Sequence, residues 1–391
     1  MSNETLIQTE NQNRRTLREQ EKQKVLSALR KKTVWKVIRR TLLVLFTVIV
    51  LAFIGVVLIC NQIFNGPSIA ARDVLTMSML ESSGMKWTPG LFIGQDTVDK
   101  IKEDVAVELP DELTDLSQIQ ISINTDSSIG GENNEWKDHP DGIRIERISG
   151  DSYNAHIMII RNPAQVYLAT STERFSESIP GARINKHIDT EGAIAAINAG
   201  AFNDDGTSSS VVGSCPEGLV LSKGKVVWKT GKAPEEGFCG FNEDNILVVA
   251  KTMTAEKAQE LNIRDGCCFG PVLIMNGNIN EEAYNSKSGY NPRTCIGQRA
   301  DGAVIFLCID GRQASSLGGT YRDCIDILVE YGAVNACNLD GGSSTVMYYR
   351  DTYGLYGEPG QVQMINNYSL LQEQPRRMPT FFMVRPADEE G

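Results

Sequence analysis

The chain has 391 residues, of which 41% are hydrophobic and 22% are charged. This composition is ordinary for a globular protein and excludes a collagen-like, coiled-coil or wholly disordered chain. The formal net charge of −11 argues against nucleic acid as a partner, because such binding needs a basic surface.

Charge is divided unevenly along the chain. Residues 1–40 contain eleven Lys and Arg residues and four Glu residues, a net charge of +7, whereas the remainder carries −18. The uncharged run at residues 41–63 follows, rich in Leu, Val, Ile and Phe. About 20 apolar residues are enough to cross a bilayer, and this run is longer than the apolar part of a cleavable signal peptide. We therefore predict a transmembrane signal anchor at residues 41–63 that binds the lipid bilayer.

The charge flanking the anchor predicts its orientation. By the positive-inside rule, residues 1–40 form a basic cytoplasmic tail, and the chain after the anchor is extracytoplasmic. The expected location is the cell membrane, as a single-pass protein. A cleavage site within residues 68–71 and a buried core helix are the two alternatives.

The part outside the membrane divides into two regions. Residues 64–142 are predicted to form an extracytoplasmic stalk or accessory region, with an amphipathic helix at residues 72–83 and a polar, glycine-containing linker at residues 124–141. The main domain is expected at residues 143–387. There short apolar runs alternate with turns, which is typical of strands.

The main domain contains residues that are typical of turns and of helix N-caps. Lys223-Gly224 and Asn276-Gly277 each separate two short apolar runs and predict hairpins. Thr254 is the predicted N-cap of a short helix. The expected fold class is α/β (α+β), with a mixed sheet core and short helices, preceded by one transmembrane helix.

A strand–loop–helix–strand unit follows residue 303. The apolar strand at residues 303–309 ends at Asp310, a helix begins at Thr320 with the spacing of a capping box, and a second strand at residues 333–339 ends at Asp340. If the connection is a right-handed crossover, the two strands are parallel and their carboxyl ends share one edge. Both carboxylates are then expected at the edge where ligands bind in open α/β sheets.

These residue types suggest chemistry at that edge. Two carboxylates can act as general acid and base in glycoside cleavage, although Asp-Gly is also a common turn pair. Arg312 lies two residues after Asp310, and its planar guanidinium suits a phosphodiester. Arg293 is a second candidate, with a surface ion pair as the alternative.

The loop after Asp340 offers backbone N–H groups and hydroxyls to an anion, in Gly341-Gly342-Ser343-Ser344. A serine hydrolase is a weaker alternative, because none of the three histidines is near Ser343 in sequence. His139 is interpreted as an exposed residue of the linker, and His156 and His187 are interpreted as structural. No metal site is predicted, since no ligand spacing demands one, and no cofactor is required. The carboxylates leave binding of a divalent cation such as Ca²⁺ open.

The eight cysteines outside the anchor are expected to be mostly buried thiols, with one bridge considered among Cys215, Cys239, Cys267 and Cys268.

Several motifs occur in order along the main domain. They are Asn198-Ala199-Gly200, Pro216-Glu217-Gly218, Asn291-Pro292-Arg293-Thr294, Asp310-Gly311-Arg312 and Asn338-Leu339-Asp340-Gly341-Gly342-Ser343. Together they resemble the phosphodiester glycosidase family, with its N-acetylglucosamine-1-phosphodiester α-N-acetylglucosaminidase-like domain, over about residues 143–387. The anchor and stalk are similar to those of bacterial membrane-anchored members.

The resemblance implies hydrolysis of a sugar-1-phosphodiester, such as a GlcNAc-α-1-phosphodiester, in cell-surface glycopolymer or exopolysaccharide metabolism. It also implies which residues line the site. Those expected to be catalytic are Asp310, Asp340 and Arg312, and those expected to bind the glycan phosphodiester are Asn198, Arg293, Thr294, Gly311, Gly341, Gly342 and Ser343. A non-catalytic protein for polysaccharide binding or assembly and a sugar-phosphate transferase are the alternative functions.

Overall fold

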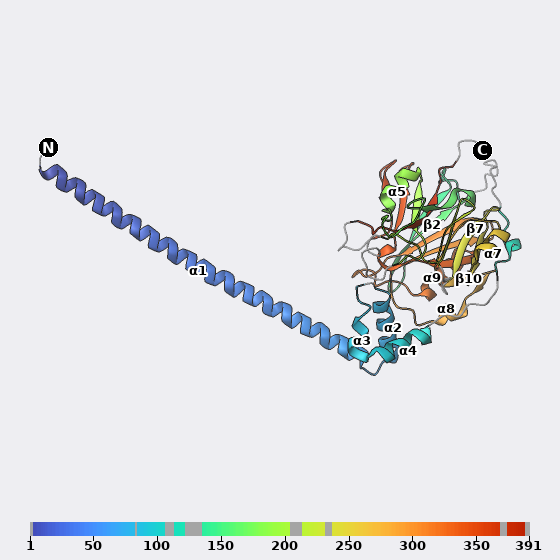
Figure 1. Ribbon diagram of the computed structural model, residues 1–391, viewed down its shortest axis with the longest axis horizontal. Coiled ribbons are helices and arrows are strands. Elements are labelled where there is room, and N and C mark those ends of the chain that lie inside the picture. Colours follow the sequence, from blue (N-terminus) through green and yellow to red (C-terminus); the bar gives the residue numbers. More distant parts are fainter. Residues whose placement is uncertain are drawn as a thin grey trace. The chain divides into compact units, whose positions relative to one another are not determined.

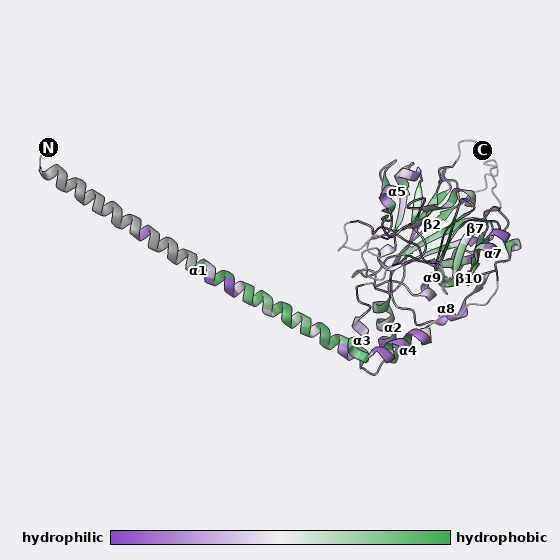
Figure 2. Cartoon of the chain, viewed as in Figure 1, coloured by the Kyte–Doolittle hydropathy of each residue, from purple (hydrophilic) through white to green (hydrophobic). Residues whose placement is uncertain are grey.

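The computed structural model describes residues 3–82, 84–105, 113–121, 135–203, 213–230, 237–367 and 374–387. They belong to two compact units, Met1–Gly66 and Pro67–Gly391. The first unit is a single helix, α1 (Asn3–Phe64). Its stretch Val34–Phe64 is long and apolar enough to cross a membrane, and it contains the whole predicted anchor at residues 41–63. Figure 2 shows this stretch as the green part of α1. A membrane anchor and a signal sequence share these properties.

The second unit begins with three short helices that pack against one another (Figure 1). They are α2 (Ile69–Leu80), α3 (Thr88–Ile93) and α4 (Gln95–Val105). The Ser68 Oγ accepts a hydrogen bond from the Ala71 N–H at 3.2 Å and caps the start of α2. The predicted helix at residues 72–83 is therefore confirmed, although α2 starts and ends three residues earlier. Most of the predicted linker, residues 124–134, lies outside the described residues.

In the described residues, the main part of the second unit consists of three antiparallel sheets with short helices, which confirms the predicted mixed α/β class. The seven-stranded sheet has the order β1 (Ile143–Ser149), β2 (Asn154–Ile160), β13 (Val304–Ile309), β12 (Arg293–Arg299), β14 (Ala333–Leu339), β10 (Val272–Met275) and β11 (Asn278–Ile279). A five-stranded sheet has the order β16 (Val362–Met364), β15 (Met347–Arg350), β4 (Ala195–Asn198), β17 (Thr380–Val384) and β3 (Val166–Thr170). The other has the order β6 (Lys225–Lys229), β5 (Leu219–Ser222), β9 (Ile263–Cys268), β7 (Phe238–Asn242) and β8 (Leu247–Ala250).

Short helices and 3₁₀ turns connect these strands. The α-helices are α5 (Ile184–Glu191), α7 (Ala255–Glu260), α8 (Glu281–Asn285) and α9 (Tyr321–Glu330), and the 3₁₀ turns are η1 (Leu116–Gln118), η2 (Pro163–Gln165) and η3 (Gly342–Ser344). The two predicted hairpins are confirmed as β5–β6 and β10–β11. Thr254 caps α7 as predicted, because its side chain accepts a hydrogen bond from the Lys257 N–H.

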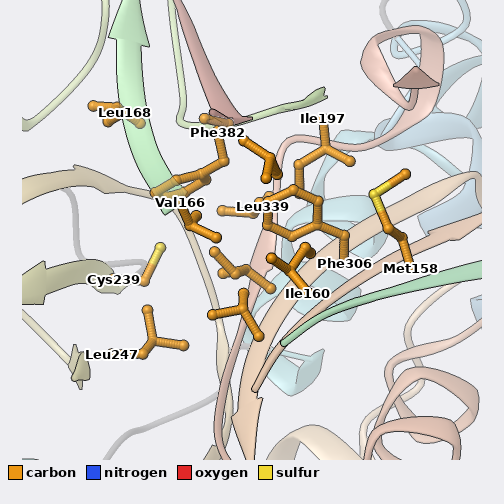
Figure 3. Packing of buried hydrophobic residues seen from close by; sticks show 14 of the residues in the cluster. Met158, Ile160, Val166, Leu168, Ile197, Cys239, Leu247, Phe306, Leu339 and Phe382 are labelled. Atoms are coloured by element: carbon orange, nitrogen blue, oxygen red, sulfur yellow. The ribbon is translucent and has the colours of Figure 1, made fainter. Parts of the chain in front are cut away.

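One hydrophobic core joins all three sheets (Figure 3). Phe306 comes from the seven-stranded sheet, Ile197 and Phe382 from one five-stranded sheet, and Cys239 and Leu247 from the other. A second cluster lies on the opposite face of the seven-stranded sheet, where α9 covers it. Strand β13 is therefore buried on both faces, which explains its continuous apolar sequence. All nine cysteines are free thiols in the structure, so the bridge considered among four of them is not formed.

The two strands that precede Asp310 and Asp340 run in the same direction, as predicted. β13 and β14 both pair antiparallel with β12, which lies between them, and they are therefore parallel to each other. The capping box at α9 is present, with Thr320 as N-cap and Asp323 bonded back to the Thr320 N–H at 2.7 Å. Cys324 and Leu328 are buried as expected, but Val329 is exposed, since it lies about 100° around the helix from Leu328.

Thr320→Ala is expected to destabilise the protein by about 1 kcal/mol, the usual contribution of an N-cap side chain. That loss corresponds to a fall in Tm of about 2–4 °C for a domain of moderate size. Thr352→Ala is the control, because Thr352 lies in an exposed loop outside the helices and strands. Thermal denaturation in detergent would compare the two variants, and equal Tm values would contradict the capping role.

Candidate active site

The sequence-predicted residues meet at one edge of the seven-stranded sheet. Asp310 and Asp340 directly follow β13 and β14, and Arg293 is the first residue of β12, which runs in the opposite direction. Arg293 is paired with Ile309, and Thr294 is paired with Leu339. The structure thus brings Asp310, Arg293 and Asp340 to the same edge.

Asn198 links this edge to the neighbouring sheet. It ends β4 and is 1% exposed. Its Nδ2 donates to the Asp340 carbonyl oxygen at 2.5 Å, and its Oδ1 accepts from the Thr294 hydroxyl at 2.8 Å and from the Val346 N–H at 3.2 Å. Asn198 and the fully buried Thr294 therefore hold together the backbone from which Asp340 projects.

Asn198→Ala is expected to lower the free energy of unfolding by about 2–3 kcal/mol, because it leaves buried polar groups without a partner. Asn278→Ala is the control, since Asn278 is exposed and its side-chain amide donates to the carbonyl oxygen of the nearby Asn276. Chemical denaturation measures both variants. A loss no larger for Asn198→Ala than for the control would contradict the linking role.

Arg312 lies over the glycine loop. Its Nη2 donates to the Asn291 Oδ1 at 3.0 Å, and a Cβ atom added at Gly342 would lie 3.3 Å from the same Nη2. Burial lowers the pKa of the Arg312 guanidinium, and the carboxylates of Glu81 and Asp340 oppose that shift. Asp340 is half-buried. This guanidinium and this carboxylate are therefore neighbours.

Arg293 is buried, not part of a surface ion pair. Its Nη1 lies 2.9 Å from the Glu81 Oε2, and its Nε and Nη2 donate to the carbonyl oxygens of Gly319 and Gly289 at 3.2 and 2.9 Å. The guanidinium also lies over the Tyr321 ring at 4.4 Å. Burial by itself lowers the pKa of Arg293, but the attraction and hydrogen bond of Glu81, together with the electrostatic effects of Tyr321 and Cys324, raise the pKa above its ordinary value.

Glu81 lies at the candidate site, and the sequence did not reveal it. It follows α2, and its Oε2 also accepts a hydrogen bond from the Asn291 Nδ2 at 2.6 Å. The Arg312 Nη2 lies 3.3 Å from the Glu81 carbonyl oxygen. A negative charge at a helix C-terminus is unfavourable, so its position in the last turn of the helix predicted at residues 72–83 was the available sequence signal.

Two further contacts hold α2 against the main domain. The Lys287 Nζ lies 2.9 Å from the buried Asp73 Oδ2. Gly289 packs so closely that a Cβ atom there would lie 2.4 Å from the Ser78 backbone nitrogen. Helix α2 is therefore bound along its length next to Arg293, and the carboxylate of Glu81 lies among the side chains of Arg293 and Asn291.

Asp310 is more enclosed than Asp340. It is 1% exposed, and its two carboxylate oxygens accept hydrogen bonds from the Asn367 N–H at 2.9 Å and Nδ2 at 2.7 Å. The Nε2 of His156 lies 3.5 Å from the Asp310 Oδ2. His156 was interpreted as structural from the sequence. Only the pairing of β2 with β13, which places His156 opposite Cys308, reveals its proximity to Asp310.

The glycines pack against Pro292. A Cβ atom at Gly311 would lie 2.7 Å from the Pro292 nitrogen, and one at Gly341 would lie 2.7 Å from the Pro292 carbonyl oxygen. The Gly342 N–H donates to that same oxygen at 2.9 Å. The Ser343 Oγ accepts a hydrogen bond from the Arg376 Nη1 at 3.3 Å. This packing requires glycine at positions 311 and 341.

Among the described residues, no group of three or more His, Cys, Asp and Glu side chains has a geometry that could hold a metal ion. The arrangement instead combines two arginines with carboxylates at one sheet edge. Such a set can hold an anionic group and transfer a proton beside it.

The part of the chain that contains these residues is similar to known proteins. The sequence model of a family described as phosphodiester glycosidase matches residues 191–385. A curated relative, the SPbeta prophage-derived uncharacterized protein YomE of Bacillus subtilis (strain 168), is 27% identical over 158 residues, which are 39% of this chain. The chain spans only 24% of the length of that relative.

Two solved structures are also similar. The zebrafish N-acetylglucosamine-1-phosphodiester α-N-acetylglucosaminidase catalytic domain, described as auto-inhibited by its pro-peptide, has 20% identity and a TM-score of 0.48, with 63% of this chain and 82% of that chain covered. A hypothetical protein from Synechocystis has 17% identity and a TM-score of 0.42, with 62% of this chain and 61% of that chain covered. The family match at residues 191–385 contains every site residue predicted from the sequence. The chain therefore belongs to the phosphodiester glycosidase family.

Proposed function

We propose that this protein is a membrane-anchored, extracytoplasmic hydrolase. Its proposed substrate is a sugar-1-phosphodiester, such as a GlcNAc-α-1-phosphodiester, in a cell-surface glycopolymer or exopolysaccharide. The observation that carries the proposal is the meeting of Asp340, Asp310, Arg312 and Arg293 at one sheet edge. Membership of the phosphodiester glycosidase family supports the reaction type.

In the proposed mechanism, Arg312 binds the phosphodiester and Asp340 is the general base. Arg312, which projects beside the glycine loop, binds the phosphodiester oxygens through its planar guanidinium. Asp340 is the half-buried carboxylate of the pair, and it acts toward the anomeric carbon. As general base it takes a proton from water while the water oxygen bonds to the anomeric carbon and the bond from that carbon to the phosphate oxygen breaks. The products are the free sugar and a phosphomonoester, and the proton passes to solvent.

The other predicted residues support this reaction indirectly. The Asp310 carboxylate accepts two hydrogen bonds from Asn367 and lies beside His156. Its proposed role is to hold Asn367 at this edge of the sheet and to contribute negative charge there. Asn198 and Thr294 fix the backbone at Asp340. A phosphomonoester is a fair leaving group, so no strong general acid is needed. The reaction requires no cofactor, and turnover measured with EDTA and with added Ca²⁺ tests the divalent-cation alternative.

The test uses the full-length protein in detergent. It is incubated with a GlcNAc-α-1-phosphodiester and with dimethyl phosphate, and release of free GlcNAc from the first and of methanol from the second is followed. Release from the first compound alone is the expected result. Binding without release would favour the polysaccharide-binding alternative, and release that depends on an added glycan acceptor would favour the transferase.

The proposed orientation has its own test. The +7 charge of residues 1–40 predicts that this segment stays inside the cell and that the main domain faces outward. Protease added to intact cells should digest the main domain and spare an N-terminal tag. Digestion of the tag with survival of the domain would reverse the orientation.

A further inference from the structure

Exposed apolar side chains are concentrated just after the candidate membrane span. Trp87 is 67% exposed and Leu91 is 72% exposed, and Met85 and Ile69 are also exposed. Among the described residues after α1, ten large apolar side chains are exposed, and these four fall within 23 residues. The remaining six are scattered over the main domain: Leu113, Tyr290, Leu317, Val329, Tyr353 and Leu355. The segment at residues 85–91, here called the apolar turn, is thus unlike the rest of this surface.

The chemistry of the apolar turn suits the boundary between lipid headgroups and acyl chains. Trp87 is the N-cap of α3 and Leu91 is four residues later, so their side chains share one face. Tryptophan is favoured at that boundary because its ring is apolar and its N–H is polar. Lys86 is exposed beside it and can extend its ammonium group toward phosphate headgroups.

The covalent chain keeps this turn within reach of the bilayer. Only four residues separate Phe64, where α1 ends, from Ile69, where α2 begins. The five steps of extended chain from Phe64 to Ile69 span at most about 18 Å. Helix α2 has 12 residues and adds about 18 Å. If α2 runs along the membrane surface, Ile69 at its start and the apolar turn after its end meet the same leaflet.

We infer that the apolar turn inserts into the outer headgroup region of the membrane and thereby holds the active site close to it. This inference rests on the proposed anchor and hydrolase function. The link to the site is α2, which is bound to the main domain through Asp73 and Lys287 and through Glu81 and Arg293. Glu81 lies only four residues before Met85. The substrate class that fits this placement is a sugar-1-phosphodiester attached to the membrane, since its reactive group stays near the surface.

Insertion is tested by fluorescence quenching with brominated lipids. Full-length Trp35→Phe protein is placed in nanodiscs of phosphatidylcholine and phosphatidylglycerol, with or without bromine on the acyl chains. Trp35 is removed because it lies within the candidate span. Bromine is expected to quench part of the tryptophan emission, and the further substitution Trp87→Phe is expected to abolish this quenching. Trp136 and Trp228 remain in both proteins as the internal reference.

The outcomes separate the inference from its premises. Equal quenching in both proteins, or none in either, would overturn the insertion of the apolar turn. Failure of both proteins to co-purify with nanodiscs would instead overturn the anchor, and the readout does not depend on activity. A change in Trp87 emission caused by a soluble GlcNAc polymer, with no effect of bromine, would assign the turn to glycan binding and refute insertion.

The inferred substrate class, a sugar-1-phosphodiester attached to the membrane, is tested with two probes in the same nanodiscs. One is a GlcNAc-phosphodiester of a long-chain alcohol, which partitions into the bilayer, and the other is its methyl analogue, which stays in water. The Trp87→Asp/Leu91→Asp variant is expected to lose about tenfold in turnover of the membrane-bound probe, because effective concentration at the surface is lost. Turnover of the methyl probe should not change. An equal loss of turnover on both probes would refute the inference that the apolar turn holds the site near membrane-bound substrate. No turnover of either probe by the unmodified protein would refute the proposed hydrolase function.

Discussion

Asp340→Asn is expected to lower kcat for release of free GlcNAc by about 10²–10⁴-fold, the range that a general base contributes. The substitution removes the negative charge at nearly constant volume. The Asn198 contact to residue 340 uses the backbone carbonyl oxygen, so it is retained. Circular dichroism and thermal denaturation should show a folded protein. The assay is sugar release from the GlcNAc-α-1-phosphodiester.

Asp310→Asn is the matched variant at the neighbouring strand end. It brings an amide against the Asn367 donors that the carboxylate now accepts, so it should lower both Tm and activity. The two variants therefore differ: Asp340→Asn loses turnover without a large loss of stability, whereas Asp310→Asn loses both. Full activity in Asp340→Asn would remove that residue as the base, and full activity in both variants would remove the proposed site.

Glu81→Gln is expected to lower KM for the anionic substrate by about tenfold, equivalent to about 1.4 kcal/mol of binding energy. In the protein the Glu81 carboxylate lies against Arg293 and Asn291 and near Arg312. A phosphodiester approaching these arginines is repelled by that carboxylate. Glutamine keeps the side-chain length and an oxygen that accepts from Asn291, but it removes the competing charge.

The same substitution is expected to lower Tm in the absence of anions. A buried guanidinium that loses its counterion is destabilising, and Arg293 is 4% exposed. Inorganic phosphate should therefore raise the Tm of Glu81→Gln more than it raises the Tm of the unmodified protein. Thermal denaturation over a series of phosphate concentrations measures this difference.

Asp73→Asn is the control for both effects. It also removes one carboxylate of α2, but that carboxylate contacts Lys287 and Arg72 and is not paired with Arg293 or Arg312. Its expected result is a lower Tm with unchanged KM and an unchanged response to phosphate. If Glu81→Gln behaves like this control, no anion competes with Glu81 at Arg293.

Much of the fold was predictable because its signals are local. The capping box at Thr320 and the turns at Lys223 and Asn276 depend on neighbouring residues only, and the structure confirms them. The parallel direction of β13 and β14 followed from the short helical connection between them. The error at Val329 has the same origin, since a local apolar pattern does not show which side of a helix faces the sheet.

The candidate site was predictable in part. Asp310, Arg312 and Asp340 stand out because polar residues directly follow buried strands, and the resemblance to a family added Asn198 and Thr294. That Asp310 is enclosed while Asp340 is half-buried could not be read from the chain. The difference depends on Asn367 and His156, which approach Asp310 from other parts of the fold.

The sequence by itself determined the apolar helix, the strand pattern, the helix caps and the two strand ends that carry aspartate, because hydrophobic period, turn residues and capping act over a few positions. The tertiary structure alone decided that β12 lies between those two strands, that Glu81 lies at Arg293, and that His156 faces Asp310. Glu81 and Asn291 are 210 positions apart. Contacts over such separations depend on how sheets and helices pack, and no local pattern of residues records them.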